Sequence, residues 1–236
     1  MRKILVISLM LSALAFGQND GLVKTYYPNG AIETEGNYTK GVRDGLWTFW
    51  YEGEVFEDFG EDGTPNTQDE GENNGVWDST ETVVVDLNGN EAFDPPLKQM
   101  EGSYVLGNRE ALWTNWYLNG MRKEEANYSN GKLNGSIIRW HENGNRSEEG
   151  TYESGKQDGR WVWYYDTGIK KELTKFLDGQ QNGLWIQWFS DGSKKSERKF
   201  ANGERDSIWT SWFDNGNKKF QATYKSGKLN GGWTSW

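Results

Sequence analysis

The residues best suited to chemistry are thirteen carboxylates gathered between Glu54 and Asp94, in a stretch without Lys or Arg. Calcium loops place oxygen ligands at alternating positions, then a glycine turn, then a further ligand at position 9 or 12. Three segments fit parts of this pattern. The ligands that the spacing predicts for Ca²⁺ are Asp58, Asp62, Asn66, Asp69, Glu70, Glu72, Asn74, Asp78, Asp86, Asn88, Asn90 and Asp94.

This acidic segment resembles the short calcium loops of thrombospondin type 3 and EF-hand-like extracellular modules. None of its three loops carries the glutamate that completes an EF-hand at position 12. The resemblance implies weak binding, with a dissociation constant on the order of 10⁻⁴ to 10⁻³ M. Bound calcium would also relieve the mutual repulsion of the carboxylates. The alternative is a solvated acidic loop that binds no ion.

Catalytic chemistry has little support in the composition. The chain has no Cys and a single His, His141, so a Cys–His pair or a multi-histidine metal site is excluded. His141 stands where other repeats carry Tyr or Phe, which indicates a substituted repeat aromatic. The glycines are spaced for turns and not for a phosphate-binding loop. We therefore predict that the protein is not an enzyme.

Aromatic residues and glycines recur with a strict period of 24 residues, which is the organising pattern of the chain. One glycine column is Gly120, Gly144, Gly168, Gly192 and Gly216. One tryptophan column is Trp113, Trp161, Trp185, Trp209 and Trp233, with Ile137 in the gap. A second aromatic column is Trp116, Trp140, Tyr164, Trp188, Trp212 and Trp236.

Each period reads as two strands and two turns. Residues 112–117 are rich in the aromatic and β-branched residues that favour strands, and residues 123–128 form a second, more polar strand. Asn119-Gly120 predicts a tight turn between them. A looser second turn is predicted over residues 129–135. The predicted fold class is all-β, an elongated antiparallel meander of tandem hairpins that advances about 10 Å per repeat.

Because Trp113 and Trp116 are three residues apart, their side chains are expected on opposite faces of the strand. One aromatic row would be the internal spine of the sheet. The other would be covered by Lys and Glu stems, by curvature or by a partner. The residues that we predict to bind a partner are Trp116, Trp140, Tyr164, Trp188 and Trp212.

The repeat resembles the variant MORN repeat, as found in the repeat family of YwqK-type antitoxins. The matching sequence includes residues 128–135, 158–161 and 212–219, and the resemblance covers residues 21–53 and 101–236. It implies a hairpin-repeat sheet used for interaction, with no catalytic residues. The first hypothesis is thus a scaffold for an unknown protein partner. The alternatives are a carbohydrate or cell-wall binding module with exposed Trp and Tyr rows, and an antitoxin-like protein.

The N-terminus predicts export. Arg2 and Lys3 precede an apolar run over residues 4–16 that is too short to span a bilayer, which is typical of a signal peptide over residues 1–17. We expect a location in the periplasm, on the outer surface or outside the cell, and no transmembrane segment. A net charge of −9 argues against nucleic acid as a partner.

The predicted order along the chain therefore has four parts. They are the signal peptide, the first repeats over residues 18–53, the acidic insert over residues 54–100, and tandem repeats over residues 101–236 with an incomplete last unit.

Overall fold

The computed structural model describes residues 20–53, 55–57, 82–85 and 97–236. The predicted signal peptide and all twelve predicted calcium ligands lie outside these residues, so both remain predictions. The chain divides into two compact units, Met1–Gly107 and Asn108–Trp236.

The described strands of the first unit form two antiparallel sheets. The larger sheet has the order β1-β2-β3-β6, and β4 pairs with β5 in the smaller one. The strands are β1 (Gly21–Tyr26), β2 (Ile32–Thr39), β3 (Val42–Trp50), β4 (Val55–Glu57), β5 (Thr82–Val85) and β6 (Lys98–Val105).

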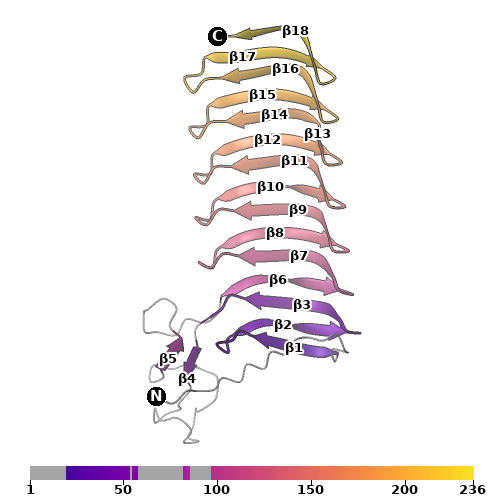
Figure 1. The fold of residues 1–236 in the computed structure, drawn as a ribbon, viewed down its shortest axis with the longest axis vertical. Coiled ribbons are helices and arrows are strands. Elements are labelled where there is room, and N and C mark those ends of the chain that lie inside the picture. Colours follow the sequence, from indigo (N-terminus) through magenta and orange to yellow (C-terminus); the bar gives the residue numbers. More distant parts are fainter. Residues whose placement is uncertain (1–19, 54, 58–81, 86–96) are drawn as a thin grey trace, which may run out of the picture. The chain divides into compact units, whose positions relative to one another are not determined.

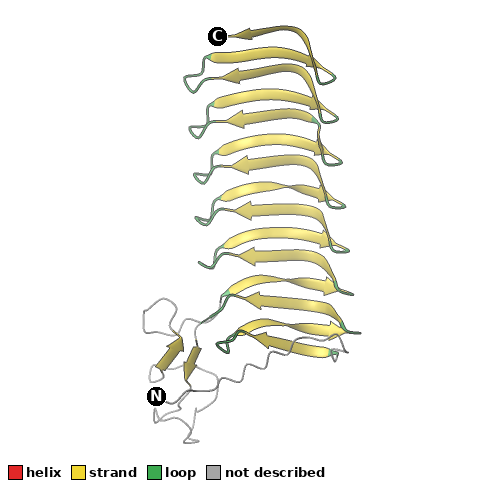
Figure 2. Cartoon of the chain, viewed as in Figure 1, coloured by secondary structure: helices red, strands yellow, loops and turns green. Residues whose placement is uncertain are grey.

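The second unit is a meander in which each strand except β13 pairs with the next one along the sheet, so that β12 pairs with β14 (Figures 1 and 2). The strands are β7 (Asn108–Trp116), β8 (Arg122–Ser129), β9 (Lys132–Trp140), β10 (Arg146–Glu153), β11 (Lys156–Tyr164), β12 (Lys170–Leu177), β13 (Gln180–Gln181), β14 (Gly183–Trp188), β15 (Lys194–Ala201), β16 (Glu204–Trp212), β17 (Lys218–Lys225) and β18 (Lys228–Ser235). Short β13 pairs with β12 alone. The predicted all-β meander of hairpins is confirmed, and the described residues contain no helix.

The two turns of a repeat differ from the prediction. The tight turn is Asn130-Gly131, where both residues have positive φ angles of 49° and 76°, as a two-residue hairpin turn requires. The turn around Asn119-Gly120 is the longer one, a loop closed by the Tyr117 amide, which donates to the carbonyl of Met121 at 2.8 Å. The sequence prediction had these two turn types reversed.

The predicted loose turn at residues 134–135 is wrong, because both residues lie inside β9. Gly135 has a φ of 110°, and the register of β8 with β9 shifts between Ala126 and Tyr128. Asn-Gly here marks a β-bulge in a continuous strand, which local turn propensity cannot distinguish from a hairpin.

A tryptophan spine is the core of each unit. Trp47 in the first unit and Trp113 and Trp161 in the second are each at most 1% exposed. The indole N–H of Trp161 donates to the carbonyl of Thr151 at 3.1 Å, and the Tyr152 ring meets the indole edge-on at 5.1 Å. Edge-to-face pairs of this kind contribute about 0.5–1.5 kcal/mol each beyond burial. One of the two predicted aromatic rows is therefore internal.

Small residues beside the spine allow the indole to lie directly on the backbone. A Cβ atom added to Gly150 would lie 2.3 Å from the Trp161 ring, and one added to Gly36 would lie 2.2 Å from Trp47. Neither glycine has a positive φ, so close approach is the reason for glycine at both positions. The same 24-residue column continues as Thr174, Arg198 and Ala222.

The tryptophan spine is irregular where this column of small residues holds the larger Arg198. Trp185 pairs with Arg198, its indole N–H is buried without a partner within the described chain, and its ring meets Phe200 at 40°. The carbonyl of Lys175 instead accepts the amide of Asn182 at 2.8 Å, and β13 and β14 are separate strands at this point. The sheet thus departs from its repeat next to Arg198.

Candidate binding surfaces

The residues predicted to bind a partner all lie on one face of the second unit. Trp116, Trp140, Tyr164, Trp188 and Trp212 are half-buried, and each lies at the end of a strand. We call their side of the sheet the Trp116 face, and the opposite side, which carries the tryptophan spine, the spine face.

Ion pairs border the aromatic row on the Trp116 face. They join residues three apart across the bulge that follows each long turn, as in Arg122–Glu125 at 2.9 Å and Arg146–Glu149 at 2.6 Å. The ammonium of Lys194 also lies 5.6 Å from the centre of the Trp212 ring. Ring faces with such a cation above them offer less area for stacking a sugar. Charged side chains therefore cover part of the outer aromatic row, which is one of the three possibilities that the sequence allowed.

A second row on the Trp116 face is aliphatic and exposed. Leu112, Leu184 and Ile208 are 48%, 42% and 55% exposed, and they stand at multiples of 24 residues from one another. Each lies on a strand, where an exposed aliphatic row signals an interaction surface more strongly than an isolated surface leucine. Sequence reasoning missed this row, although its period was visible, because Ser136 and Arg160 interrupt it.

Tyrosines in the long turns join each repeat to the next. The hydroxyl of Tyr117 donates to the backbone carbonyl of Trp140 at 2.7 Å. The hydroxyl of Tyr165 donates to the backbone carbonyl of Trp188 at 2.9 Å. His141 occupies the same position, with Nε2 at 3.2 Å from the carbonyl oxygen of Tyr164. This is the environment expected of a substituted repeat aromatic. Phe189, at the next equivalent position, has no hydroxyl to donate.

A polar row runs along the spine face beside the tryptophans. Arg139 lies between two carboxylates, with Nε at 2.6 Å from Glu124 and Nη1 at 3.1 Å from Glu148. Burial by itself would lower the pKa of Arg139, but the hydrogen bond to Glu124 and the charge of Glu148 raise it above its ordinary value. Farther along the row, Gln187 Nε2 donates to Glu172 at 2.9 Å. In these repeats the half-buried Arg139 has two carboxylate partners, and Glu172 accepts a hydrogen bond from a neutral amide.

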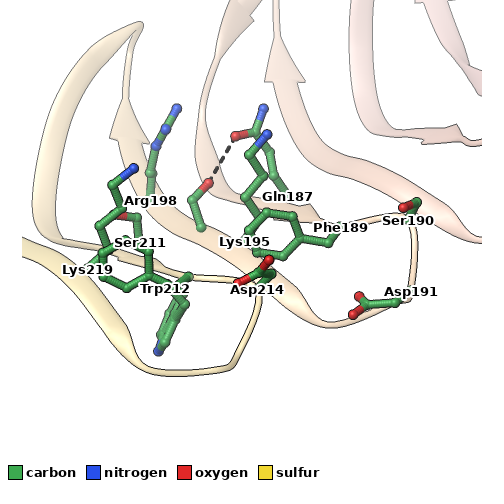
Figure 3. Close-up of a pocket in the computed structure, with 12 residues that line it drawn as sticks. Gln187, Phe189, Ser190, Asp191, Lys195, Arg198, Ser211, Trp212, Asp214 and Lys219 are labelled. Carbon is green, nitrogen blue, oxygen red and sulfur yellow. Dashed lines mark hydrogen bonds between the residues drawn. The ribbon is translucent and has the colours of Figure 1, made fainter.

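The pairing of charged side chains on the spine face differs between β14 and β17. A groove of about 700 Å³ opens there (Figure 3). We call it the Arg198 groove. Its lining residues are Gln187, Phe189, Ser190, Asp191, Lys195, Ser196, Arg198, Ser211, Trp212, Phe213, Asp214 and Lys219. Arg198 lies on β15, and its guanidinium carbon is 5.0 Å from the ring centre of Trp185 and 5.3 Å from that of Trp209.

Arg198 differs from Arg139 in having no carboxylate within ion-pair distance in the described part of the chain. Burial lowers the pKa of Arg198, and although Glu172 opposes this effect, Arg205 adds to it, so the pKa falls below its ordinary value. Sequence reasoning missed this residue. The available signal was that the column beside the spine holds only Gly, Ala or Thr elsewhere in the second unit.

The described residues contain neither a cluster of metal-ligating side chains nor a helix that could span a membrane. Within the ranges given above, no group of three or more His, Asp or Glu side chains is arranged to hold a metal ion. No helix in those ranges is long and apolar enough to cross a membrane.

Comparison with known families finds one match. Four segments of the chain match the MORN repeat variant, residues 19–40, 109–130, 157–178 and 205–226. The three matches in the second unit start 48 residues apart, so they fall on every second 24-residue repeat. Each of the three covers most of two paired strands, as in β7 with β8. No curated protein matches the chain.

Proposed function

Starting from a chain that carries four MORN repeat variants, we propose that it is a non-enzymatic, exported repeat scaffold that holds a protein partner on its Trp116 face. The observation that carries this proposal is the exposed aliphatic row of Leu112, Leu184 and Ile208 beside the half-buried aromatic row. Burial of one such side chain is worth about 1.5–3 kcal/mol. A partner that covers several of them would gain enough to offset part of the cost of association.

The regular repeat architecture supports a scaffold. Its polar residues form a regular row on the spine face, and the sequence, which has no Cys, offers no Cys–His pair. Charged pairs border the apolar rows of the Trp116 face, as at the rim of many protein interfaces. MORN repeats are generally not catalytic, which agrees with this assignment.

Position-specific photo-crosslinking tests the assigned face. We expect a photo-reactive phenylalanine analogue at Leu184 or Ile208 to crosslink the full chain to one protein in its native compartment. Leu118 is the matched control, because it is a 66% exposed aliphatic residue in a long turn. The Leu184→Lys substitution should reduce the crosslink from position 208. Equal crosslinking from position 118 would contradict the proposal. Binding of the chain to soluble glycans, with no crosslink to a protein, would contradict it as well.

Export is proposed from the predicted signal peptide, and it separates the scaffold from the antitoxin-like alternative. We expect the mature protein to start near Gln18 and to be found outside the cytoplasm. N-terminal sequencing and cell fractionation measure both. A full-length chain in the cytosol would favour the antitoxin-like alternative.

Calcium binding is proposed for the acidic insert from the spacing of its carboxylates. Calorimetric titration of the full chain should show binding on the order of 10⁻⁴ to 10⁻³ M. The double substitution Glu70→Gln and Glu72→Gln should remove part of that heat. Asp178→Asn, which changes an exposed carboxylate outside the insert, should not. An absence of heat at about millimolar calcium would identify the insert as a plain acidic loop.

A further inference from the structure

The Arg198 groove combines features that no other described repeat shares. The column that holds Glu124, Glu148 and Glu172 in earlier repeats holds Ser196 here. At the same repeat the small-residue column holds Arg198. One carboxylate is thus replaced by a hydroxyl and one small residue by a guanidinium, so the local charge of the spine face changes from negative to positive.

The equivalent groove two repeats earlier shows what this exchange does. That groove has a volume of about 360 Å³ and is lined by His141, Ser147, Glu148, Trp163, Tyr164, Lys171 and Glu172. Two carboxylates line it, and His141 contacts the carbonyl of the next repeat. In the Arg198 groove the corresponding ring is Phe189, which makes no such hydrogen bond, and the volume is about 700 Å³.

Three cations line the Arg198 groove without a carboxylate partner within the described residues, namely Arg198, Lys195 and Lys219. The two acidic residues that line it belong to the turns (Figure 3). Asp191 accepts hydrogen bonds from the amide and hydroxyl of Ser193, at 2.8 and 2.6 Å. Asp214 accepts the amide of Asn215 at 2.8 Å.

We propose that the Arg198 groove binds a ligand through a carboxylate group, with the guanidinium of Arg198 and the hydroxyl of Ser211 as donors. A partly desolvated guanidinium is stabilised by a carboxylate through charge-assisted hydrogen bonds. The rings of Phe189 and Phe213 provide apolar walls, and the volume lies within the range of ligand sites. Asp191 and Asp214 would repel a doubly charged phosphate more strongly than a singly charged carboxylate, which favours the carboxylate.

Excess positive charge near the groove would attract such a ligand. Residues 191–236 carry nine Lys and Arg against five Asp and Glu, whereas residues 108–190 carry eleven of each. The positive charge of the second unit is therefore concentrated in its last repeats, where it raises the local concentration of anions.

The test uses the full chain and two substitutions that copy other repeats and should therefore fold. Arg198→Ala installs the residue found at Ala126 and Ala222, and Ser196→Glu restores the carboxylate of Glu172. Lys228→Ala is the control, because it removes an exposed cation outside the groove. Circular dichroism and the thermal midpoint verify that each variant is folded.

The probes are the peptide Gly-Glu-Gly-Glu-Gly-amide with an uncharged boron-dipyrromethene dye on its N-terminal amine, its glutamine analogue with the same dye, and N-acetylglutamate as an unlabelled competitor. At about 0.15 M salt we expect the acidic peptide to bind and the glutamine analogue not to bind. Arg198→Ala and Ser196→Glu should each raise the dissociation constant at least tenfold, as expected when a hydrogen bond to a charged group is lost. Lys228→Ala should change it less than about twofold.

The competition separates the two sources of a carboxylate. Displacement by N-acetylglutamate at a concentration similar to that of unlabelled peptide would identify a small free carboxylate as the ligand. Displacement only at a concentration higher by at least about tenfold would identify an acidic peptide segment. Binding of the glutamine analogue, equal weakening by Lys228→Ala, or stronger displacement by inorganic phosphate than by acetate would each overturn the proposal.

Discussion

Trp161→Ala is expected to lower the free energy of unfolding of the second unit by about 3–5 kcal/mol. The indole is fully buried, donates to the carbonyl of Thr151 and contacts the rings of Tyr152, Trp163 and Phe176 at 5.1, 5.7 and 6.2 Å. Alanine would leave a cavity at the centre of a thin sheet and an unsatisfied carbonyl beside it. Urea denaturation monitored by circular dichroism measures the change.

Trp233 is the matched control for this substitution. It belongs to the same 24-residue column, but its side chain is 60% exposed and its main ring contact is Phe220 at 6.3 Å. Trp233→Ala should cost less than about 1 kcal/mol. Equal losses for the two variants would show that burial in the spine does not determine stability.

Gly150→Ala is expected to lower the free energy of unfolding by about 1–3 kcal/mol. The new methyl carbon would lie 2.3 Å from the Trp161 ring, so the indole would have to move and its hydrogen bond to Thr151 would weaken. Urea denaturation gives the loss, and the near-ultraviolet circular dichroism of tryptophan reports the displacement of the ring.

Gly232→Ala separates this clash from a general effect of removing glycine. Gly232 also lies on a strand without a positive φ, but a Cβ atom there would meet nothing within 4 Å. Alanine should be neutral or slightly stabilising at this position, because it reduces the conformational freedom of the unfolded chain. A smaller loss for Gly150→Ala than for Gly232→Ala would contradict the close-packing explanation.

The periodicity of the sequence was enough to predict the fold class, because one assignment of strands and turns applies to every 24-residue repeat. An error at one position of the repeat would have disrupted all of the repeats. The positions of Trp113 and Trp116 on opposite faces also follow directly from strand geometry. The turns were harder to predict. Asn119-Gly120 and Asn134-Gly135 both carry a strong local turn signal, yet only strand pairing determines that the first lies in a longer loop and the second in a bulge.

The candidate sites were only partly predictable for a different reason. The predicted aromatic row lies on one face, but it is bordered by ion pairs such as Arg122–Glu125, which span a bulge that the sequence did not predict. The groove at Arg198 depends on two substitutions in neighbouring columns and on the missing hydroxyl of Phe189. Each change is a single residue in the sequence, and only the register of the sheet places the three residues in the same groove.

The tyrosine contacts between successive turns have a consequence for how the second unit folds. Tyr117 with Trp140, and Tyr165 with Trp188, join residues that are only 23 apart. Strands also pair only with near neighbours along the chain. The relative contact order of this unit is therefore low for an all-β protein, and little loop-closure entropy is lost at each step. Folding can start at any hairpin and extend in both directions, at rates closer to those of helical proteins than of β-sandwiches.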